Sequence, residues 1–217
     1  LDVAQLPSIE YFRIPGLKIV PGCAIASDGP VESVRLFLRV PGAAVRTVAL
    51  DPSSRTSVAL TQIILRERYS ASPSLSMWNG AVPPSDVPSD AVLVIGDAGM
   101  KDIAGFADVL DLGAEWQRLT GLPFVYALWA VRAEVKWRGL ERVLLAAKAQ
   151  GLAAVDEIAR QEAERIGRPF ERCRDYLSRS IRYDFGEREL AGLKRFYEYA
   201  VALNLAERGR SIEFYGQ

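Results

Sequence analysis

Histidine is missing altogether from this sequence of 217 residues. The absence removes the most frequent general base, a frequent metal ligand and the usual serine–histidine–aspartate triad. Any catalysis by this chain therefore has to use carboxylates, hydroxyls, amides or a group that the substrate itself supplies.

Cysteine is almost as scarce, since Cys23 and Cys173 are the only two. A single, widely separated pair has no metal-binding spacing, which favours reduced core residues over a disulfide or a zinc site. We therefore expect no metal centre.

Excess charge of one sign and long apolar runs are missing as well. Lys and Arg together number 27, as do Asp and Glu, so no overall field attracts nucleic acid or an anionic membrane. The longest apolar stretches, such as residues 124–131, are too short to cross a bilayer, and no basic segment followed by an apolar one opens the chain. We expect a cytoplasmic protein that binds neither nucleic acid nor membrane; a homodimer is compatible with this composition.

What is present is an alternation of strand and helix patterns, with 49% hydrophobic residues to build a core. Helices are predicted at residues 7–12 and 54–66 and through most of the chain after residue 132, with Gly151 as a break, and a loop is predicted at residues 70–89. Alternating or continuous apolar patterns predict strands at residues 2–6, 18–27, 33–40, 45–50, 91–95, 106–110 and 124–131.

The long strands at 33–40 and 124–131 flank a middle section that has the pattern of an inserted lobe. We therefore expect an α/β fold with two lobes that clamp a ligand in the cleft between them. Lobe one is expected to comprise residues 1–40 and 132–217, and lobe two residues 41–131. Because Leu1 opens in mid-pattern without an initiator methionine, we expect the N-terminal part of lobe one to be missing from this sequence.

The strongest sign of a binding site is the step from the strand at 45–50 into the helix at 54–66. Ser54, Thr56 and Ser57 accompany Arg55 at a helix N-terminus, where free backbone N–H groups favour an anion such as a carboxylate. The alternative is plain N-capping by Ser53 or Ser54, which needs only one hydroxyl. Arg55 either pairs with a ligand carboxylate or points outward to acids of the protein.

Other polar groups stand at strand ends that a clamp would bring to its cleft. These are Ser8, Ser27, Gly96 and Asp97. Ser8 and Asp97 would serve equally well as helix caps. The prediction of a site therefore rests on the whole set of groups rather than on one member.

Six motifs in this order resemble the chorismate dehydratases of the futalosine route to menaquinone. They are DVAQLPSIEY at 2–11, IASDGPVESV at 25–34, SRTS at 54–57, IGDA at 95–98, DLGAEW at 111–116 and GLPFVYALWA at 121–130. The resemblance implies a type II periplasmic-binding-protein fold, in agreement with the clamp. It also implies a lyase that dehydrates chorismate to 3-[(1-carboxyvinyl)oxy]benzoate without a cofactor. Family members carry an earlier strand and helix with a Tyr-Leu-Asn motif, which nothing in this sequence matches.

The resemblance also implies roles for the candidate residues. Ser27 and Asp97 would be catalytic, while Ser8, Ser27, Ser54, Arg55, Thr56, Ser57 and Gly96 would bind a small dicarboxylate substrate. A carboxylate of that substrate would act as the base, which suits a chain without histidine.

Two other functions stay open from the sequence. A sister enzyme of the same pathway and fold makes 1,4-dihydroxy-6-naphthoate, but that branch is expected to use a histidine. A solute receptor with the same clamp would bind a carboxylate without catalysis, although no export signal or lipid-attachment cysteine opens this chain.

Overall fold

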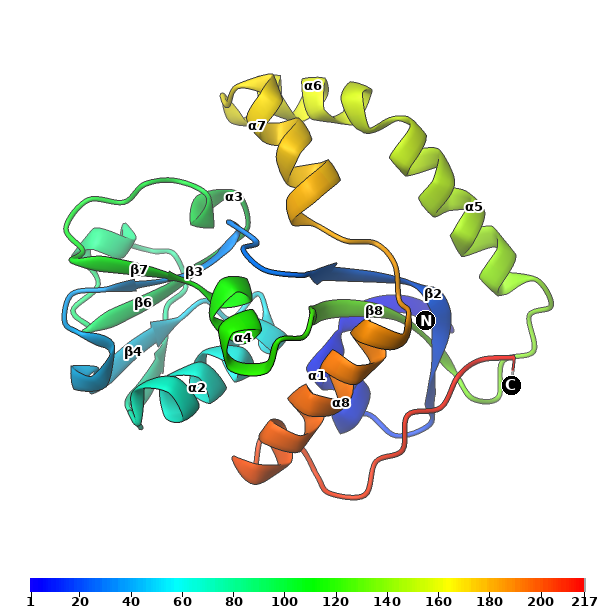
Figure 1. The fold of residues 1–217 in the computed structure, drawn as a ribbon, viewed down its shortest axis with the longest axis horizontal. Coiled ribbons are helices and arrows are strands. Elements are labelled where there is room, and N and C mark those ends of the chain that lie inside the picture. Colours follow the sequence, from blue (N-terminus) through cyan, green and yellow to red (C-terminus); the bar gives the residue numbers. More distant parts are fainter. Residues whose placement is uncertain (217) are drawn as a thin grey trace.

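Two β-sheets make up the centre of the computed structural model, which describes residues 1–216 (Figure 1). The sheet of lobe one has the order β1–β8–β2 and consists of β1 (Val3–Pro7), β8 (Phe124–Arg132) and β2 (Leu17–Ser27). The sheet of lobe two has the order β5–β4–β6–β3–β7 and consists of β5 (Ser74–Met77), β4 (Thr47–Leu50), β6 (Ala91–Ile95), β3 (Val34–Leu38) and β7 (Asp108–Asp111). By sheet membership we use the name lobe one for residues 1–27 and 124–216, and lobe two for residues 28–123.

The helices fall into three groups (Figure 1). Lobe one contains α1 (Ser8–Arg13) and α8 (Glu187–Ala202), and lobe two contains α2 (Arg55–Tyr69), α3 (Gly96–Gly99) and α4 (Leu112–Thr120). A third group rises from lobe one and arches towards lobe two, and we name it the arm. It consists of α5 (Leu140–Ala153), α6 (Val155–Ile166), α7 (Phe170–Asp175) and the π-helical turn η3 (Tyr176–Ser180). Two short 3-10 turns, Gly42–Ala44 and Pro84–Asp86, complete the elements of lobe two.

Strand β3 shows how the sheet of lobe two buries both of its faces. Leu36 and Leu38 point into the main core, whereas Phe37 points to the opposite face and packs with Phe106, at a ring distance of 5.3 Å. The Arg39 guanidinium lies over the Phe106 ring at 4.3 Å. The face of β3 that alternates with the main core therefore also lies against protein, because a cation such as that of Arg39 can rest on the face of an aromatic ring.

The two lobes share one core where the chain passes between them. Trp116 of α4 in lobe two packs edge-on against Phe124 of β8 and Phe196 of α8, at 5.2 and 6.2 Å between ring centroids. Its buried indole N–H donates to the Pro123 carbonyl at 3.1 Å. Aromatic packing of this kind makes the junction part of the hydrophobic core rather than an open linker.

Most predicted elements are present, with three differences. Strand β5 lies in the predicted loop at 70–89, where its short and exposed sequence pairs in parallel with β4. Helix α5 runs through Gly151 and ends at Ala153, since one exposed glycine does not stop a helix. The third difference is the assignment of β3 and β8 to sheets: β3 pairs with β6 and β7, and β8 pairs with β1 and β2. The chain therefore passes between the sheets at residues 27–34 and 111–124, whereas the sequence pattern predicted lobe boundaries at residues 40 and 131. The predicted division into two folding units stays a prediction.

Within residues 1–216, none of the helices combines the length and the apolar character that crossing a membrane would require. Cys23 and Cys173 are both buried and unpaired, as expected of reduced core residues.

Two helical glycines should respond in opposite ways to alanine. A Cβ at Gly192 in α8 would overlap the Pro123 carbonyl oxygen, whereas a Cβ at Gly151 in α5 would meet no atom within 4 Å. We expect Gly192→Ala to lower the free energy of unfolding by about 1–3 kcal/mol, and Gly151→Ala to raise it by about 0.5–1 kcal/mol. Urea unfolding curves of both variants test this, and a stabilised Gly192→Ala protein would contradict the close packing of α8 on the junction.

Candidate functional site

The predicted hydroxyl groups come together where the two lobes meet. The Ser8 hydroxyl, at the start of α1, donates to the Val125 carbonyl of β8 at 2.6 Å. The Thr56 hydroxyl, in the first turn of α2, accepts from the Ile9 N–H at 3.3 Å. Strand β8 in turn pairs with β2, so these bonds join α1, α2 and the end of β2. These bonds therefore connect α1 to β8 and to the start of α2, and Ser27 follows Ala26, the β2 residue that pairs with Val125.

Ser54 caps α2, as the simpler reading of this segment predicts. Its hydroxyl accepts from the Ser57 N–H at 3.3 Å and lies 2.7 Å from the Ser57 hydroxyl. Ser53 instead bonds to Asp51, through its N–H at 2.9 Å and its hydroxyl at 2.5 Å. Thr56 and Ser57 are fully buried. One hydroxyl thus serves as the cap, while the Ser57 hydroxyl bonds to that cap and the Thr56 hydroxyl accepts from the Ile9 N–H.

Arg55 contacts an acid of the protein. Its guanidinium lies 3.1 Å from Glu10 of α1, and its side chain is 65% exposed. Arg13 contacts the other oxygen of the same carboxylate at 2.9 Å. In this structure Arg55 therefore points outward and pairs with an acid of the protein, which is one of the two predicted alternatives. A role of Arg55 in binding substrate stays a prediction.

Ser27 is buried at the end of β2 with two protein partners. Its hydroxyl donates to the Gly29 carbonyl at 3.0 Å and lies 3.2 Å from the Tyr126 hydroxyl. Burial raises the pKa of Tyr126 well above its usual range, so this phenol keeps its proton and donates to Ser27. A Cβ at Gly113 in α4 would lie 2.7 Å from the Ser27 hydroxyl oxygen and 2.8 Å from that of Tyr126, so only glycine fits beside this pair.

Gly96 and Asp97 lie on another part of lobe two, at the start of α3. The Gly96 N–H donates to the Ser33 carbonyl at 2.8 Å, and Gly96 adopts a φ of 64°. Asp97 is 49% exposed and forms an ion pair with Arg165 of α6 at 2.8 Å. Among residues 1–216, no hydrogen bond or ion pair joins Asp97 to Ser8, Ser27, Thr56 or Ser57. Its predicted catalytic role is untested by these contacts.

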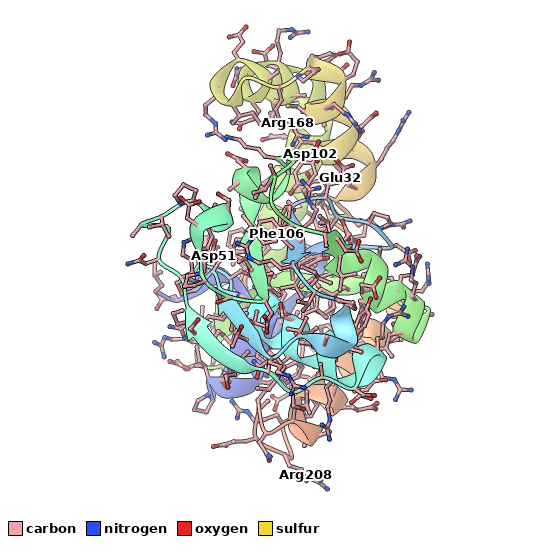
Figure 2. The ribbon with its side chains drawn as sticks, turned by 90° about the vertical axis from the view of Figure 1, so that its left-hand side faces the viewer. Glu32, Asp51, Asp102, Phe106, Arg168 and Arg208 are labelled. Carbon is pink, nitrogen blue, oxygen red and sulfur yellow. The ribbon has the colours of Figure 1, made fainter. Side chains whose placement is uncertain are left out.

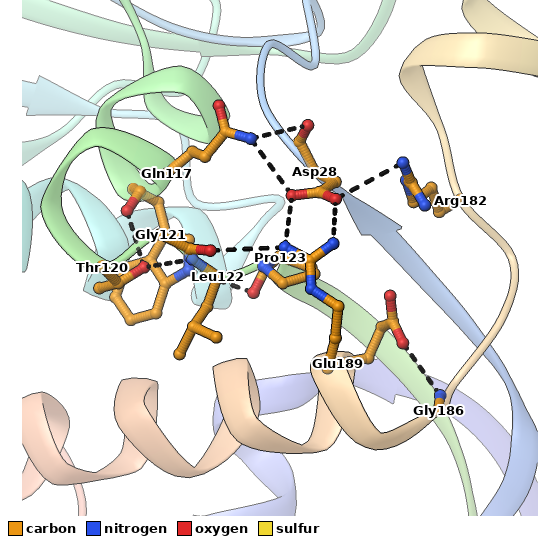
Figure 3. A network of polar contacts seen from close by, with 11 residues as sticks. Asp28, Gln117, Thr120, Gly121, Leu122, Pro123, Arg182, Gly186 and Glu189 are labelled. Atoms are coloured by element: carbon orange, nitrogen blue, oxygen red, sulfur yellow. Dashed lines mark hydrogen bonds and ion pairs between the residues drawn. The ribbon is translucent and has the colours of Figure 1, made fainter.

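The sequence reading missed the polar network that surrounds Asp28 (Figure 3). This carboxylate is 9% exposed and lies 2.6 Å from Arg188 and 3.5 Å from Arg182. Gln117 of α4 donates to it at 3.2 Å, and Arg188 also reaches the Gly121 carbonyl at 3.4 Å. The motif in which Asp28 stands, Asp-Gly-Pro, indicates only a turn, because its partners lie far away in the sequence.

A second group that the sequence reading missed joins the arm to lobe two. The Tyr176 hydroxyl of η3 contacts the buried Ser33 hydroxyl at 2.9 Å. Figure 2 shows Glu32, Asp102 and Arg168 where the arm approaches lobe two, and a cavity of about 300 Å³ lies between them. This arrangement makes the arm part of the surroundings of α3.

Solved structures with this architecture have the periplasmic-binding-protein-like fold. A protein of Archaeoglobus fulgidus has a TM-score of 0.66 at 20% identity, over 94% of this chain and 80% of that one. The periplasmic aliphatic sulphonate binding protein SsuA from Escherichia coli has a TM-score of 0.55 at 15% identity, over 96% and 77%. A structure described as an ABC transporter from Parabacteroides distasonis has a TM-score of 0.61 at 14% identity, over 100% and 81%. The chain is thus a two-lobed α/β clamp of this class, as predicted.

Within that class, the chain belongs to the menaquinone biosynthesis family, whose family model matches residues 1–202. The chorismate dehydratase of Thermus thermophilus is 34% identical over 210 residues, which cover 87% of this chain and 76% of that protein. The chorismate dehydratase of Campylobacter jejuni is 28% identical over 160 residues, which cover 73% and 60%. The family predicted from the six motifs is confirmed.

The Asp28 network predicts a stability that depends on pH. Burial alone would raise the pKa of Asp28, but the hydrogen bond and charge of Arg188, with Gln117 and Arg182, outweigh it and lower that pKa. A carboxylate with a lowered pKa stabilises the fold above its unfolded value of about 3.9 and loses this effect as pH falls through the folded value. We expect Asp28→Asn to reduce the free energy of unfolding by about 1.5–3 kcal/mol near neutral pH, with a smaller difference in acid.

The matched control is Asp156→Asn, which removes an exposed ion pair with Arg174 on the arm. Its effect should stay within about 1 kcal/mol. Urea unfolding at several pH values measures both variants. A difference between wild type and Asp28→Asn that is the same in acid as at neutral pH would contradict the proposed role of the carboxylate charge.

Proposed function

We propose that this chain is a chorismate dehydratase, a lyase that removes water from chorismate to give 3-[(1-carboxyvinyl)oxy]benzoate. The observation that carries the proposal is its 34% identity, over 87% of its length, to a protein of that name. Since chorismate is an intermediate of biosynthesis, we place the activity in the cytoplasm.

The lobe junction suits a substrate with two carboxylates. Hydroxyl groups and the N-terminus of the fifteen-residue helix α2 can bind an anion without a local excess of basic residues. In the proposal, Thr56 and Ser57 hold one carboxylate at the start of α2, and Ser8 adds a third hydroxyl beside them. Ser27 holds the other carboxylate after its hydroxyl turns away from the Gly29 carbonyl.

The reaction itself needs little acid or base catalysis from the protein. The C–H bond breaks at the ring carbon that bears the enolpyruvyl ether, the C–O bond breaks at the neighbouring carbon, and hydroxide and proton leave together as water. The ring becomes aromatic, which supplies the driving force. We propose that the side-chain carboxylate of chorismate removes the proton, so that the protein mainly orients the substrate and keeps water away.

The first test is turnover of chorismate followed by mass spectrometry. The purified chain, together with any further residues that its gene encodes, should give an aromatic product one water lighter, faster than a protein-free control. Thermal stabilisation by chorismate without this product would reject the lyase and favour a carboxylate receptor with the same fold.

Ser27→Ala tests the substrate contact. Loss of one hydrogen bond to a charged group should lower kcat/KM about 10- to 150-fold. Ser72→Ala is the control for a lost hydroxyl, because Ser72 bonds to Arg66 on the surface of lobe two and should keep full activity.

A second control separates substrate binding from packing. Tyr126→Phe removes one of the two protein partners of Ser27 but leaves the Ser27 hydroxyl in place. It should therefore keep most of the activity that Ser27→Ala loses. Equal losses in the two variants, or full turnover by Ser27→Ala, would show that Ser27 does not hold the substrate.

A further inference from the structure

The arm reaches lobe two at the short turn that contains Gly96 and Asp97. One contact is direct. Arg165 of α6 lies 2.8 Å from Asp97, and the same nitrogen of Arg165 lies 2.5 Å from Glu162, one turn earlier in α6. Glu162 and Asp97 therefore share one guanidinium nitrogen, and the Arg165 side chain is 58% exposed.

The other contact acts through Ser33. The Tyr176 hydroxyl meets the buried Ser33 side chain at 2.9 Å, while the Ser33 carbonyl accepts from the Gly96 N–H at 2.8 Å. A Cβ at Gly99 would lie 2.9 Å from that same carbonyl oxygen, so α3 packs directly on the Ser33 backbone. Tyr176 thus contacts Ser33, the residue against which the Gly96–Asp97 turn packs.

These two contacts set Arg165 and Tyr176 apart from other polar side chains of the arm. Arg160 on the same helix forms the same kind of ion pair, with Glu157 at 2.9 Å, but its ion-pair partner lies within α6. Tyr176 stands at the start of a π-helical turn, a rare conformation that often occurs at functional sites. Two contacts of the arm, one from α6 and one from η3, thus meet at one turn of lobe two.

We propose that Arg165 and Tyr176 are positioning residues, through which the arm fixes the Gly96–Asp97 turn for contact with the substrate. The inference rests on the proposed function in so far as that turn contacts chorismate. The arm then completes the clamp, because a segment of lobe one sets the position of a binding element of lobe two.

Kinetics of matched variants test the direct contact. Arg165→Gln should raise KM up to about fivefold, the range for an exposed ion pair, with little change in kcat. Arg165→Lys keeps the charge and should restore most of the affinity, and Arg160→Gln should match wild type. In an Asp97→Asn background, Arg165→Gln should have no further effect. An equal KM for Arg165→Gln and Arg160→Gln would overturn the proposal.

Hydrogen exchange tests the same proposal without turnover. In Arg165→Gln and in Tyr176→Phe, the amides of residues 96–100 should exchange about two- to fivefold faster than in wild type. Arg160→Gln is again the control for the arginine variant. Tyr197→Phe is the control for the tyrosine variant, because it removes a hydroxyl that bonds to Glu207 and Arg210 near the C-terminal end. Both controls should leave the exchange of residues 96–100 unchanged.

The two experiments fail separately. Unchanged exchange at residues 96–100 would overturn the positioning role whatever the activity of the protein. A wild-type protein without chorismate turnover would overturn the proposed function alone, and faster exchange in both arm variants would still support the role of the arm in holding the turn.

Discussion

One guanidinium group ties together both passages of the chain between its sheets. Arg188, in the first turn of α8, bonds to Asp28 on the outgoing passage and to the Gly121 carbonyl on the returning one. The Glu189 carboxylate accepts from the Gly186 N–H at 3.0 Å and caps the start of α8, the helix that carries Arg188 (Figure 3 shows Glu189 and Gly186). Because Asp28 is largely buried, its charge needs these partners, and the two passages are held to each other as a result.

The close packing around Ser27 lies beside these two passages. With the passages held together, the start of α4 lies directly against the end of β2, and Gly113 is required where Ser27 and Tyr126 meet. Trp116, one turn further along α4, then reaches the aromatic core of lobe one. Polar and apolar contacts thus reinforce each other at the junction, and the candidate binding groups lie on a rigid base rather than on free loops.

Local patterns in the sequence predicted the parts of this structure that depend on neighbours along the chain. The strands, the cap of α2 by Ser54 and the buried cysteines are of this kind. The contacts that join segments far apart could not be read in the same way. Asp28 and Arg188 are 160 residues apart, and the pair Ser33 and Tyr176 is 143 apart. The sequence pattern placed β3 in lobe one and β8 in lobe two, whereas the structure has the reverse. The cause is the same, since apolar alternation predicts a strand but not its partners.

The protonation of the tyrosines near the junction bears on the chemistry of a chain without histidine. Burial raises the pKa of Tyr126, and burial with the nearby charges of Asp97 and Glu32 outweighs the Ser33 hydrogen bond and raises that of Tyr176. Both phenols therefore stay neutral at physiological pH, and they can donate hydrogen bonds but cannot accept a proton as a general base. Serine and threonine hydroxyls have the same limitation. Such groups can bind and orient carboxylates, which supports the proposal that a carboxylate of the substrate acts as the base.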